Sequence, residues 1–261
     1  MSLTALLTVN LGALFALLTV AWVLSLILGK VSIVDSFWGL GFVLVAWIGQ
    51  TAAPGDPARK WLLTVMVTVW GVRLAWHITS RSWGEPEDRR YREMRQEHGG
   101  SFRLRSLVTV FWLQAVLLWV VSLVVQMGQW SPTPAGLVVT DWIGAGLWLP
   151  GIVFETVADS QMQRFKADPE NKGKVMDQGL WRYSRHPNYF GEALVWWGIA
   201  VAVLPTVHGV WGLVSPCLIT FLLLKVSGVT MAEQNIESRR PGYAAYAKRT
   251  NAFIPWFPGN D

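Results

Sequence analysis

Pairs of polar side chains four residues apart stand inside strongly apolar segments of this sequence. Glu155 and Asp159 form one such pair, and Asn188 and Glu192 form another. Residues four apart lie on one face of a helix. An ionisable group inside a membrane span costs about 2.5–3.5 kcal/mol on insertion scales, so each one is a candidate for function. Taken alone, each pair fits either a buried contact that fixes helix packing or the wall of a polar cavity.

Two further apolar segments carry the same kind of residue. Asp35 stands in Val-Asp-Ser-Phe-Trp-Gly, and Arg73 is followed four residues later by His77. Arg73 and Asp35 could be a structural ion pair. Because four stripes occur near the same ends of four segments, we instead expect them to line one polar cavity that opens to the cytoplasm.

Residues 177 to 198 contain a recognisable helix start. Pro187 suits the first turn of a helix, and Ser184 or Asn188 can supply capping hydrogen bonds. The helix would begin with its free amides beside basic side chains, and such an end attracts phosphate. Gly191, one turn in, would allow another helix or a flat ligand to approach closely.

Basic residues precede this helix and could meet an anionic ligand. The preceding loop contributes Lys166, Lys172 and Lys174, and the residues just before the helix are Arg182, Arg185 and His186. In the tail, Tyr243 and Tyr246 are three apart on a short amphipathic segment. They could float that segment at the membrane interface, or close a lid over the cavity together with Arg239.

The elements that must position these residues are membrane helices. The chain of 261 residues is 52% hydrophobic and only 15% charged, with 17 tryptophans, whereas soluble chains average about 25% charged. A bilayer needs roughly 20 apolar residues per helix. Seven candidate spans follow: residues 3 to 28, 33 to 50, 60 to 80, 104 to 128, 138 to 163, 187 to 204 and 208 to 229.

The number of spans depends on one break and on the distribution of charge. Pro205 and Gly209 divide the last apolar stretch, and six spans is the competing count. With seven spans, 18 basic residues fall on one side and two, Arg59 and Lys60, on the other. Lysine and arginine resist translocation. We therefore predict an amino terminus outside, a cytoplasmic carboxyl terminus, basic cytoplasmic loops at 81–103 and 164–186 and a cytoplasmic tail at 230–261. The whole chain, 1–261, would be one membrane-embedded domain.

Several classes of function are disfavoured. Gly39-Leu-Gly41 and Gly144-Ala-Gly146 lack the remaining glycine of a dinucleotide fingerprint, so we interpret them as helix-packing glycines. The histidines are scattered, and no metal site is predicted. Cys217, the single cysteine, is interpreted as a buried apolar residue. No nucleic-acid partner is expected, because membrane topology and anionic lipids account for the basic loops. The sequence carries no signal for an oligomeric state.

The motifs resemble a known family. Trp181-Arg-Tyr-Ser-Arg-His-Pro-Asn-Tyr-Phe-Gly-Glu192, with Glu155-Thr-Val-Ala-Asp159 before it and residues 246 to 255 after it, resembles the steroid 5-alpha-reductase family. The match covers roughly the last 120 residues. Val34-Asp-Ser-Phe-Trp-Gly and Trp70-Gly-Val-Arg-Leu resemble its bacterial branch.

The resemblance implies a seven-helix membrane reductase that uses NADPH to saturate a carbon–carbon double bond conjugated to a ketone. The family's nucleotide site falls on Asp159, Asn188 and Glu192, with Tyr189 and Arg185 adjacent. Lys166 and Lys174 stand where phosphate contacts are expected. The full set of candidate cofactor-binding residues is Asp159, Lys166, Lys174, Arg182, Arg185, Asn188, Tyr189, Glu192, Arg239 and Tyr246.

The reaction also needs an acid or hydrogen-bond donor at the carbonyl, where enolate charge develops. The animal enzymes use a glutamate and a tyrosine from their second and third spans. This chain offers Asp35 in the second and no tyrosine in the third, so Asp35 is the first candidate, followed by Arg73, His77 and Tyr91. Asp35 would have to stay protonated, which burial in a bilayer favours.

Two other functions remain open. Membrane methyltransferases that use S-adenosylmethionine also carry Arg-His-Pro-x-Tyr-x-Gly, which residues 185 to 191 satisfy, but they usually have paired glutamates where this chain separates Glu233 from Glu237. A non-enzymatic lipid-binding protein would explain the topology. The resemblance favours a reductase of a lipophilic, steroid-like or isoprenoid enone, embedded among membrane lipids of a bacterial inner membrane.

Overall fold

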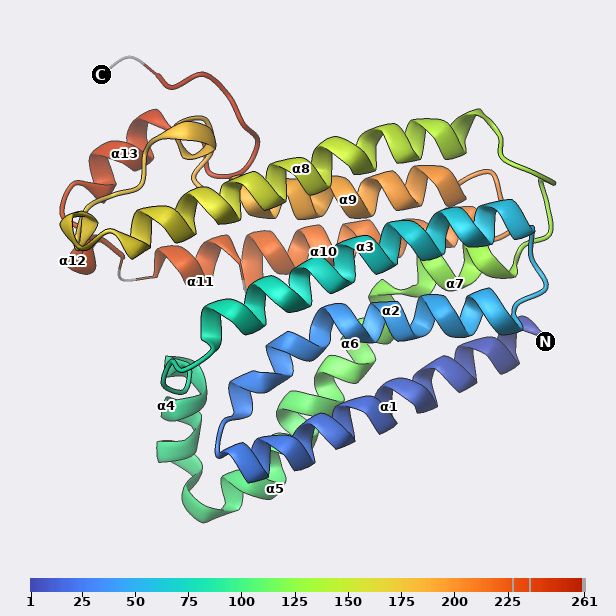
Figure 1. Ribbon diagram of the computed structural model, residues 1–261, viewed down its shortest axis with the longest axis horizontal. Coiled ribbons are helices and arrows are strands. Elements are labelled where there is room, and N and C mark those ends of the chain that lie inside the picture. The colour runs from blue at the N-terminus through green and yellow to red at the C-terminus, as the bar shows by residue number, and fades with distance from the viewer. Residues whose placement is uncertain (227, 235, 260–261) are drawn as a thin grey trace. The chain divides into compact units, whose positions relative to one another are not determined.

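The computed structural model describes residues 1–226, 228–234 and 236–259, which contain helices and no strand (Figure 1). The α-helices are α1 (Leu3–Leu28), α2 (Val34–Ala52), α3 (Pro57–Ser82), α4 (Arg89–His98), α5 (Phe102–Ser106), α6 (Leu113–Val121), α7 (Leu123–Trp130), α8 (Val139–Ala167), α9 (Pro187–Val203), α10 (Val214–Phe221), α11 (Val229–Glu233), α12 (Ile236–Arg239) and α13 (Tyr243–Arg249). Two π-helical turns, Leu107–Trp112 and Leu222–Val226, join α5 to α6 and follow α10.

Five helical segments of the described chain are long and apolar enough to cross a membrane: Leu3–Leu28, Val31–Ala52, Pro57–Ser82, Arg89–Val121 and Gly209–Arg239. They are the segments of an integral membrane protein, as predicted. The other two predicted spans, α8 and α9, are not among them. Asp141, Glu155 and Asp159 make α8 more polar, and α9 has only 17 residues. Seven spans and the orientation remain predictions.

The break that separates six spans from seven is present. The helix α9 ends at Val203, a 3₁₀ turn covers Gly209–Leu213, and α10 begins at Val214. The predicted basic loop at 81–103 also contains regular structure. The side chain of Asp88 accepts a hydrogen bond from the amide of Arg90 at 2.9 Å and starts α4. Arginine, glutamate, methionine and glutamine, which make up most of α4, are good helix formers.

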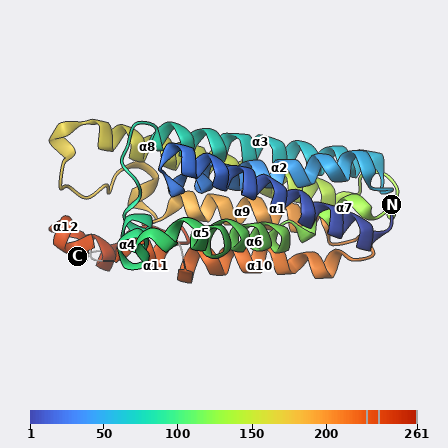
Figure 2. The same cartoon turned by 90° about the horizontal axis from the view of Figure 1, so that it is seen from below.

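The described chain divides into two compact units. The first comprises Met1–Asp141 and Val203–Ser215, and the second comprises Trp142–Ala202 and the chain from Pro216 on. In the first unit α2 packs along α3 and against α1. A methyl group on Gly71 would lie 2.6 Å from the carbonyl oxygen of Gly39, so these glycines let α2 and α3 touch. Figure 2 shows α4, α5 and α6 of this unit following one another.

In the second unit α8 packs against α9 through glycines on both helices. A methyl group on Gly191 would lie 2.7 Å from the carbonyl oxygen of Gly151, and Gly144 meets Gly198 in the same way. The interpretation of Gly39, Gly41 and Gly144 as packing glycines is therefore confirmed. A methyl group on Gly146 would meet nothing within 4 Å, so the same interpretation is wrong for Gly146. The sequence left open whether Gly191 admits a flat ligand or another helix. In the structure its close neighbour is the helix α8. Cys217 is exposed on α10, so its interpretation as a buried residue is wrong.

Candidate functional site

The candidate acid of the first unit lies beside a tyrosine. Asp35 stands in the first turn of α2, and the buried Tyr91 of α4 donates a hydrogen bond from its hydroxyl to Oδ1 of Asp35 at 3.3 Å. The guanidinium of Arg90 lies 3.5 Å from Oδ2. The structure therefore brings two of the four catalytic candidates together, and the tyrosine comes from α4 rather than from the third span. We call Asp35 and Tyr91 the Asp35 pair.

A carboxylate that the sequence analysis missed holds α4 in place. Glu87, just before α4, accepts hydrogen bonds from the amides of Val31 at 2.6 Å and Ser32 at 2.9 Å. Arg95 on α4 donates to the carbonyl oxygen of Gly29 at 3.0 Å. Because these contacts join α4 to the chain just before α2, they fix Tyr91 against Asp35.

The other two catalytic candidates, Arg73 and His77, lie one turn apart on α3, and both are partly buried. The spacing therefore gives the shared helix face that the sequence predicted. Their part in the chemistry remains a prediction.

In the second unit, α8 and α9 bring together the polar stripes predicted from the sequence. The side-chain amide of Asn188, in the first turn of α9, donates to Oδ1 of the buried Asp159 at 3.2 Å. Within the described residues, the buried Oδ1 of Asn188 has no hydrogen-bond partner. Glu155 is buried one turn before Asp159, and Glu192 is partly buried one turn after Asn188. An unsatisfied buried acceptor of this kind suits a ligand that carries an N–H or O–H donor.

The helix α9 begins at Pro187, as predicted. Just before it, Oγ of Ser184 accepts a hydrogen bond from the amide of His186 at 3.1 Å. The ring of Tyr189 stacks on that of His186, with 5.2 Å between centroids and 3° between planes. Both rings therefore have fixed orientations beside Asn188.

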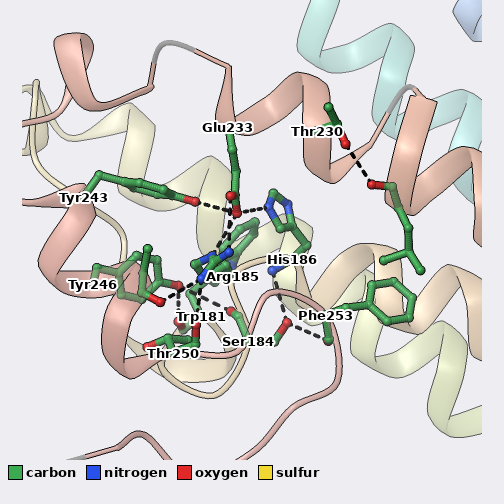
Figure 3. A network of polar contacts seen from close by, with 12 residues as sticks. Trp181, Ser184, Arg185, His186, Thr230, Glu233, Tyr243, Tyr246, Thr250 and Phe253 are labelled. Carbon is green, nitrogen blue, oxygen red and sulfur yellow. Dashed lines mark hydrogen bonds and ion pairs between the residues drawn. The ribbon is translucent and has the colours of Figure 1, made fainter.

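A second acid, Glu233 at the end of α11, gathers four donor atoms (Figure 3). Arg185 donates from Nε at 2.8 Å and from Nη2 at 3.2 Å. The ring nitrogen Nε2 of His186 and the hydroxyl of Tyr243 each lie 2.9 Å from Oε1. Burial, and then the nearby carboxylate of Glu233, raise the pKa of Tyr243 above its usual value, so the hydroxyl stays a donor. We call these four residues the Glu233 cluster.

The same segment holds the tail of the chain. Arg185 donates from Nη1 to the carbonyl oxygens of Ala247 at 2.8 Å and Thr250 at 3.0 Å. Ser184 donates to the carbonyl oxygen of Phe253 at 2.8 Å, and the hydroxyl of the buried Tyr246 donates to that of Trp181. Because Tyr243 and Tyr246 are buried in protein, the alternative in which they float the tail at the membrane interface is wrong.

The remaining basic candidates lie at the surface of the second unit. Lys166 ends α8, Lys174 follows a short 3₁₀ turn, and Arg182 ends another; all three are exposed. Arg239, at the end of α12, is exposed and donates to the carbonyl oxygen of Gln234 at 3.0 Å. Arg185 differs from them, because its donors bind Glu233 and the tail. Arg185 therefore has a structural role in this unit, and a contact with a cofactor remains a prediction for it.

Glu233 and its contacts were not recognised from the sequence as a site. A signal existed in the neighbouring Arg185 and His186, because two cationic or hydrogen-bonding groups beside a buried helix start need an acceptor. The sequence pattern marked Glu233 for its separation from Glu237, and not for a contact with Arg185 or His186. Arg185 and Glu233 are 48 positions apart in the sequence, so their contact could not be predicted from spacing. In the described part of the chain, no three His, Cys, Asp or Glu side chains gather as metal ligands would.

Together these features define a helical membrane protein whose polar groups come from helix ends. Comparison with known proteins gives the family. Residues 21–250 match the family described as "Protein of unknown function (DUF1295)", and the chain belongs to it.

Curated relatives carry the name 3-oxo-5-alpha-steroid 4-dehydrogenase 1. The protein of Rattus norvegicus is 28% identical over 124 residues, 44% of each chain. That of Mus musculus is 28% identical over 123 residues, 44% of this chain and 45% of the relative. That of Homo sapiens is 35% identical over 60 residues, 23% of each chain. The predicted resemblance to the steroid 5-alpha-reductases is confirmed, although this chain spans less than half the length of these relatives. No solved structure matches the chain.

Proposed function

We propose that this protein reduces a carbon–carbon double bond conjugated to a ketone in a lipophilic, steroid-like substrate, with NADPH as the reductant. The observation that carries the proposal is the match to proteins named 3-oxo-5-alpha-steroid 4-dehydrogenase 1. Those matches cover under half of each chain, so the arrangement of this chain's own residues has to support the rest.

The residues of the second unit fit a dinucleotide. The buried Oδ1 of Asn188 lacks a partner among the described residues, and its amide nitrogen is oriented by Asp159. An acceptor fixed in this way suits the amide or hydroxyl donors of a nicotinamide riboside. Asp159, Asn188 and Glu192 would hold the cofactor, and Lys166 and Lys174 supply the positive charge that an extra 2′-phosphate favours. When bound, NADPH supplies the hydride.

The Asp35 pair supplies what the ketone needs. As hydride reaches the beta carbon, negative charge develops on the carbonyl oxygen, and a donor fixed beside that oxygen stabilises the transition state. Tyr91 has one hydroxyl proton, which it donates to Asp35 across the 3.3 Å contact. A protonated Asp35 gives the pair a second proton: either Asp35 donates to the substrate carbonyl, or Asp35 donates to Tyr91 and the hydroxyl of Tyr91 turns to the carbonyl. We propose that the pair acts in this way, with Arg73 and His77 as further candidates.

Ligand binding tests the proposal and separates it from the two alternatives. Purified, detergent-solubilised protein is titrated with NADPH and, separately, with S-adenosylmethionine, and the heat of binding is measured. Saturable binding of NADPH but not of the methyl donor supports the reductase. Binding of the methyl donor alone would identify a methyltransferase, and binding of neither would support a lipid-binding protein.

Turnover is then measured with a 3-oxo-4-ene steroid as the decay of NADPH absorbance, with product identified by mass spectrometry. We expect a product two hydrogen atoms heavier than the substrate. A steroid with an isolated, unconjugated double bond is the control and should not react, because it has no carbonyl to stabilise the developing charge.

A further inference from the structure

A small, partly open hollow lies in the first unit between the last turns of α1 and the helix α5. Ser25 and Leu26 of α1 line one side, and Phe102, Arg103 and Ser106 line the other. Arg95 of α4 and the chain at Gly29 and Val31 complete it. We propose that this hollow binds the phosphate of an anionic phospholipid. The inference does not depend on the proposed function.

The charge of the hollow favours an anion. Two arginines and no acidic residue line it. Arg103 is exposed, and its guanidinium makes no hydrogen bond or ion pair within the described residues. Arg95 is partly committed, since it donates to the carbonyl oxygen of Gly29 and lies 3.4 Å from Glu87, but 43% of its side chain is exposed. Arg103 is therefore the cation with spare capacity for a phosphate.

The surrounding segment adds to this field. Residues 89 to 106 hold six arginines against two glutamates. One of these, Glu93, is paired with Arg89 at 2.6 Å. Basic segments next to a membrane attract anionic lipids by roughly 1 kcal/mol per basic residue. The hollow, with Arg95 and Arg103 in its lining, is the defined position at which a lipid phosphate would bind.

Apolar side chains in and next to the hollow favour a lipid over a free ion. Leu26, which lines the hollow, is exposed by 42%. Its neighbours Leu24, Ile27 and Leu28, on the last turns of α1, are exposed by 37%, 74% and 62%. Trp22 donates from its indole nitrogen to the carbonyl oxygen of Arg103 at 2.9 Å, which joins α1 to α5 beside the hollow. Tryptophan prefers the membrane–water interface. A phospholipid could place its phosphate in the hollow and its chains along α1, whereas inorganic phosphate would leave these leucine and isoleucine side chains without a partner.

Native mass spectrometry of the full chain in detergent tests the inference. The protein is titrated with phosphatidylglycerol and with phosphatidylcholine of the same acyl chains, and bound lipid is counted. We expect preferential binding of phosphatidylglycerol, and about a fivefold loss of that affinity in Arg103→Gln. Arg103→Lys should retain most of it. The matched control is Arg105→Gln, which removes an exposed positive charge from the same helix outside the hollow.

Three results would overturn the proposal. Equal binding of the two lipids would show no selection for the anion. An equal effect of Arg103→Gln and Arg105→Gln, or no effect of either, would show diffuse attraction without a site. Displacement of the lipid by excess inorganic phosphate would assign the hollow to the free ion. Unchanged melting of each variant confirms that it is folded, so that a lost adduct reports on binding.

Discussion

The two units each contain a carboxylate in contact with tyrosine and arginine, but the two carboxylates are held very differently. Glu233 receives two nitrogens of Arg185, a ring nitrogen of His186 and the hydroxyl of Tyr243, all between 2.8 and 3.2 Å. Asp35 has longer contacts, 3.3 Å to Tyr91 and 3.5 Å to Arg90. Strong charge-assisted hydrogen bonds are shorter than the two contacts of Asp35, so Asp35 is held less tightly than Glu233.

The difference separates an anchor from an available group. If this carboxylate moved away, the arginine, the histidine and the tyrosine that it contacts would lose a hydrogen-bond partner inside the protein, which is costly. Glu233 therefore stabilises the start of α9 and the tail. Asp35 keeps about a third of its side chain exposed, at 32%, and has room for another partner. The loosely held pair is the one expected to act on a substrate.

Removing Glu233 should have the largest effect on stability. Glu233→Ala leaves the partly buried Arg185 and the buried His186 without their acceptor, and loss of one partner of a buried pair costs about 3–5 kcal/mol. We expect about 3 kcal/mol, because 23% of the Glu233 side chain is exposed. Melting of the detergent-solubilised protein should fall by roughly 6–12 °C. Glu237→Ala, an exposed acid on α12, is the matched control, and equal melting of the two variants would contradict the anchor.

Changes to the Asp35 pair should instead reduce turnover. We expect Asp35→Asn and Tyr91→Phe each to slow NADPH-dependent reduction by about 100-fold or more, the typical size of a positioned acid's contribution. NADPH affinity should be unchanged, because no cofactor contact is proposed for the first unit. Tyr183→Phe, whose ring packs on Phe257, serves as the control. Normal turnover of both variants would remove the Asp35 pair from the reaction.

The long apolar helices were predictable from the sequence, because an apolar run of sufficient length decides them. The first predicted span, residues 3 to 28, coincides with α1, and the break near Pro205 and Gly209 is present. Glycine, proline and the distribution of arginine act locally, so they can be interpreted without knowing the fold. The same locality explains the correct helix start at Pro187.

Contacts between distant segments were harder to predict. The sequence offered no tyrosine in the third span, yet Tyr91 reaches Asp35 from a helix inside a predicted loop. Glu87 fixes that helix through two backbone amides, and nothing in its spacing predicts this. Glu233 was likewise separated from its partners. Periodicity identifies which residues share one helix face, whereas a contact between elements depends on how loops fold.

The nucleotide contact gives a smaller expected effect than the acid. Asn188→Ala removes the unsatisfied acceptor and the bond to Asp159, so NADPH affinity should fall about tenfold, near the value of one or two hydrogen bonds. Glu192→Ala should weaken binding in the same direction. Gln163→Ala, exposed one turn beyond Asp159 on α8, is the control. Unchanged affinity in both of the first two variants, measured by calorimetry, would contradict the assignment of this site to the cofactor.

The smallest effect separates the contribution of Tyr243 from the rest of the Glu233 cluster. Tyr243→Phe removes one hydrogen bond to Glu233 and should cost about 1 kcal/mol near neutral pH. The pKa of Tyr243 is raised in the folded protein, first by burial and then by Glu233. Its contribution is therefore complete below the unfolded pKa of about 10 and falls as the pH rises above it. Melting curves at about pH 8 and about pH 11 should show the gap between wild type and Tyr243→Phe closing at the higher pH. A gap that stays constant would mean that Tyr243 stabilises the cluster through its ring alone, and Glu233 would then be anchored by Arg185 and His186 without it.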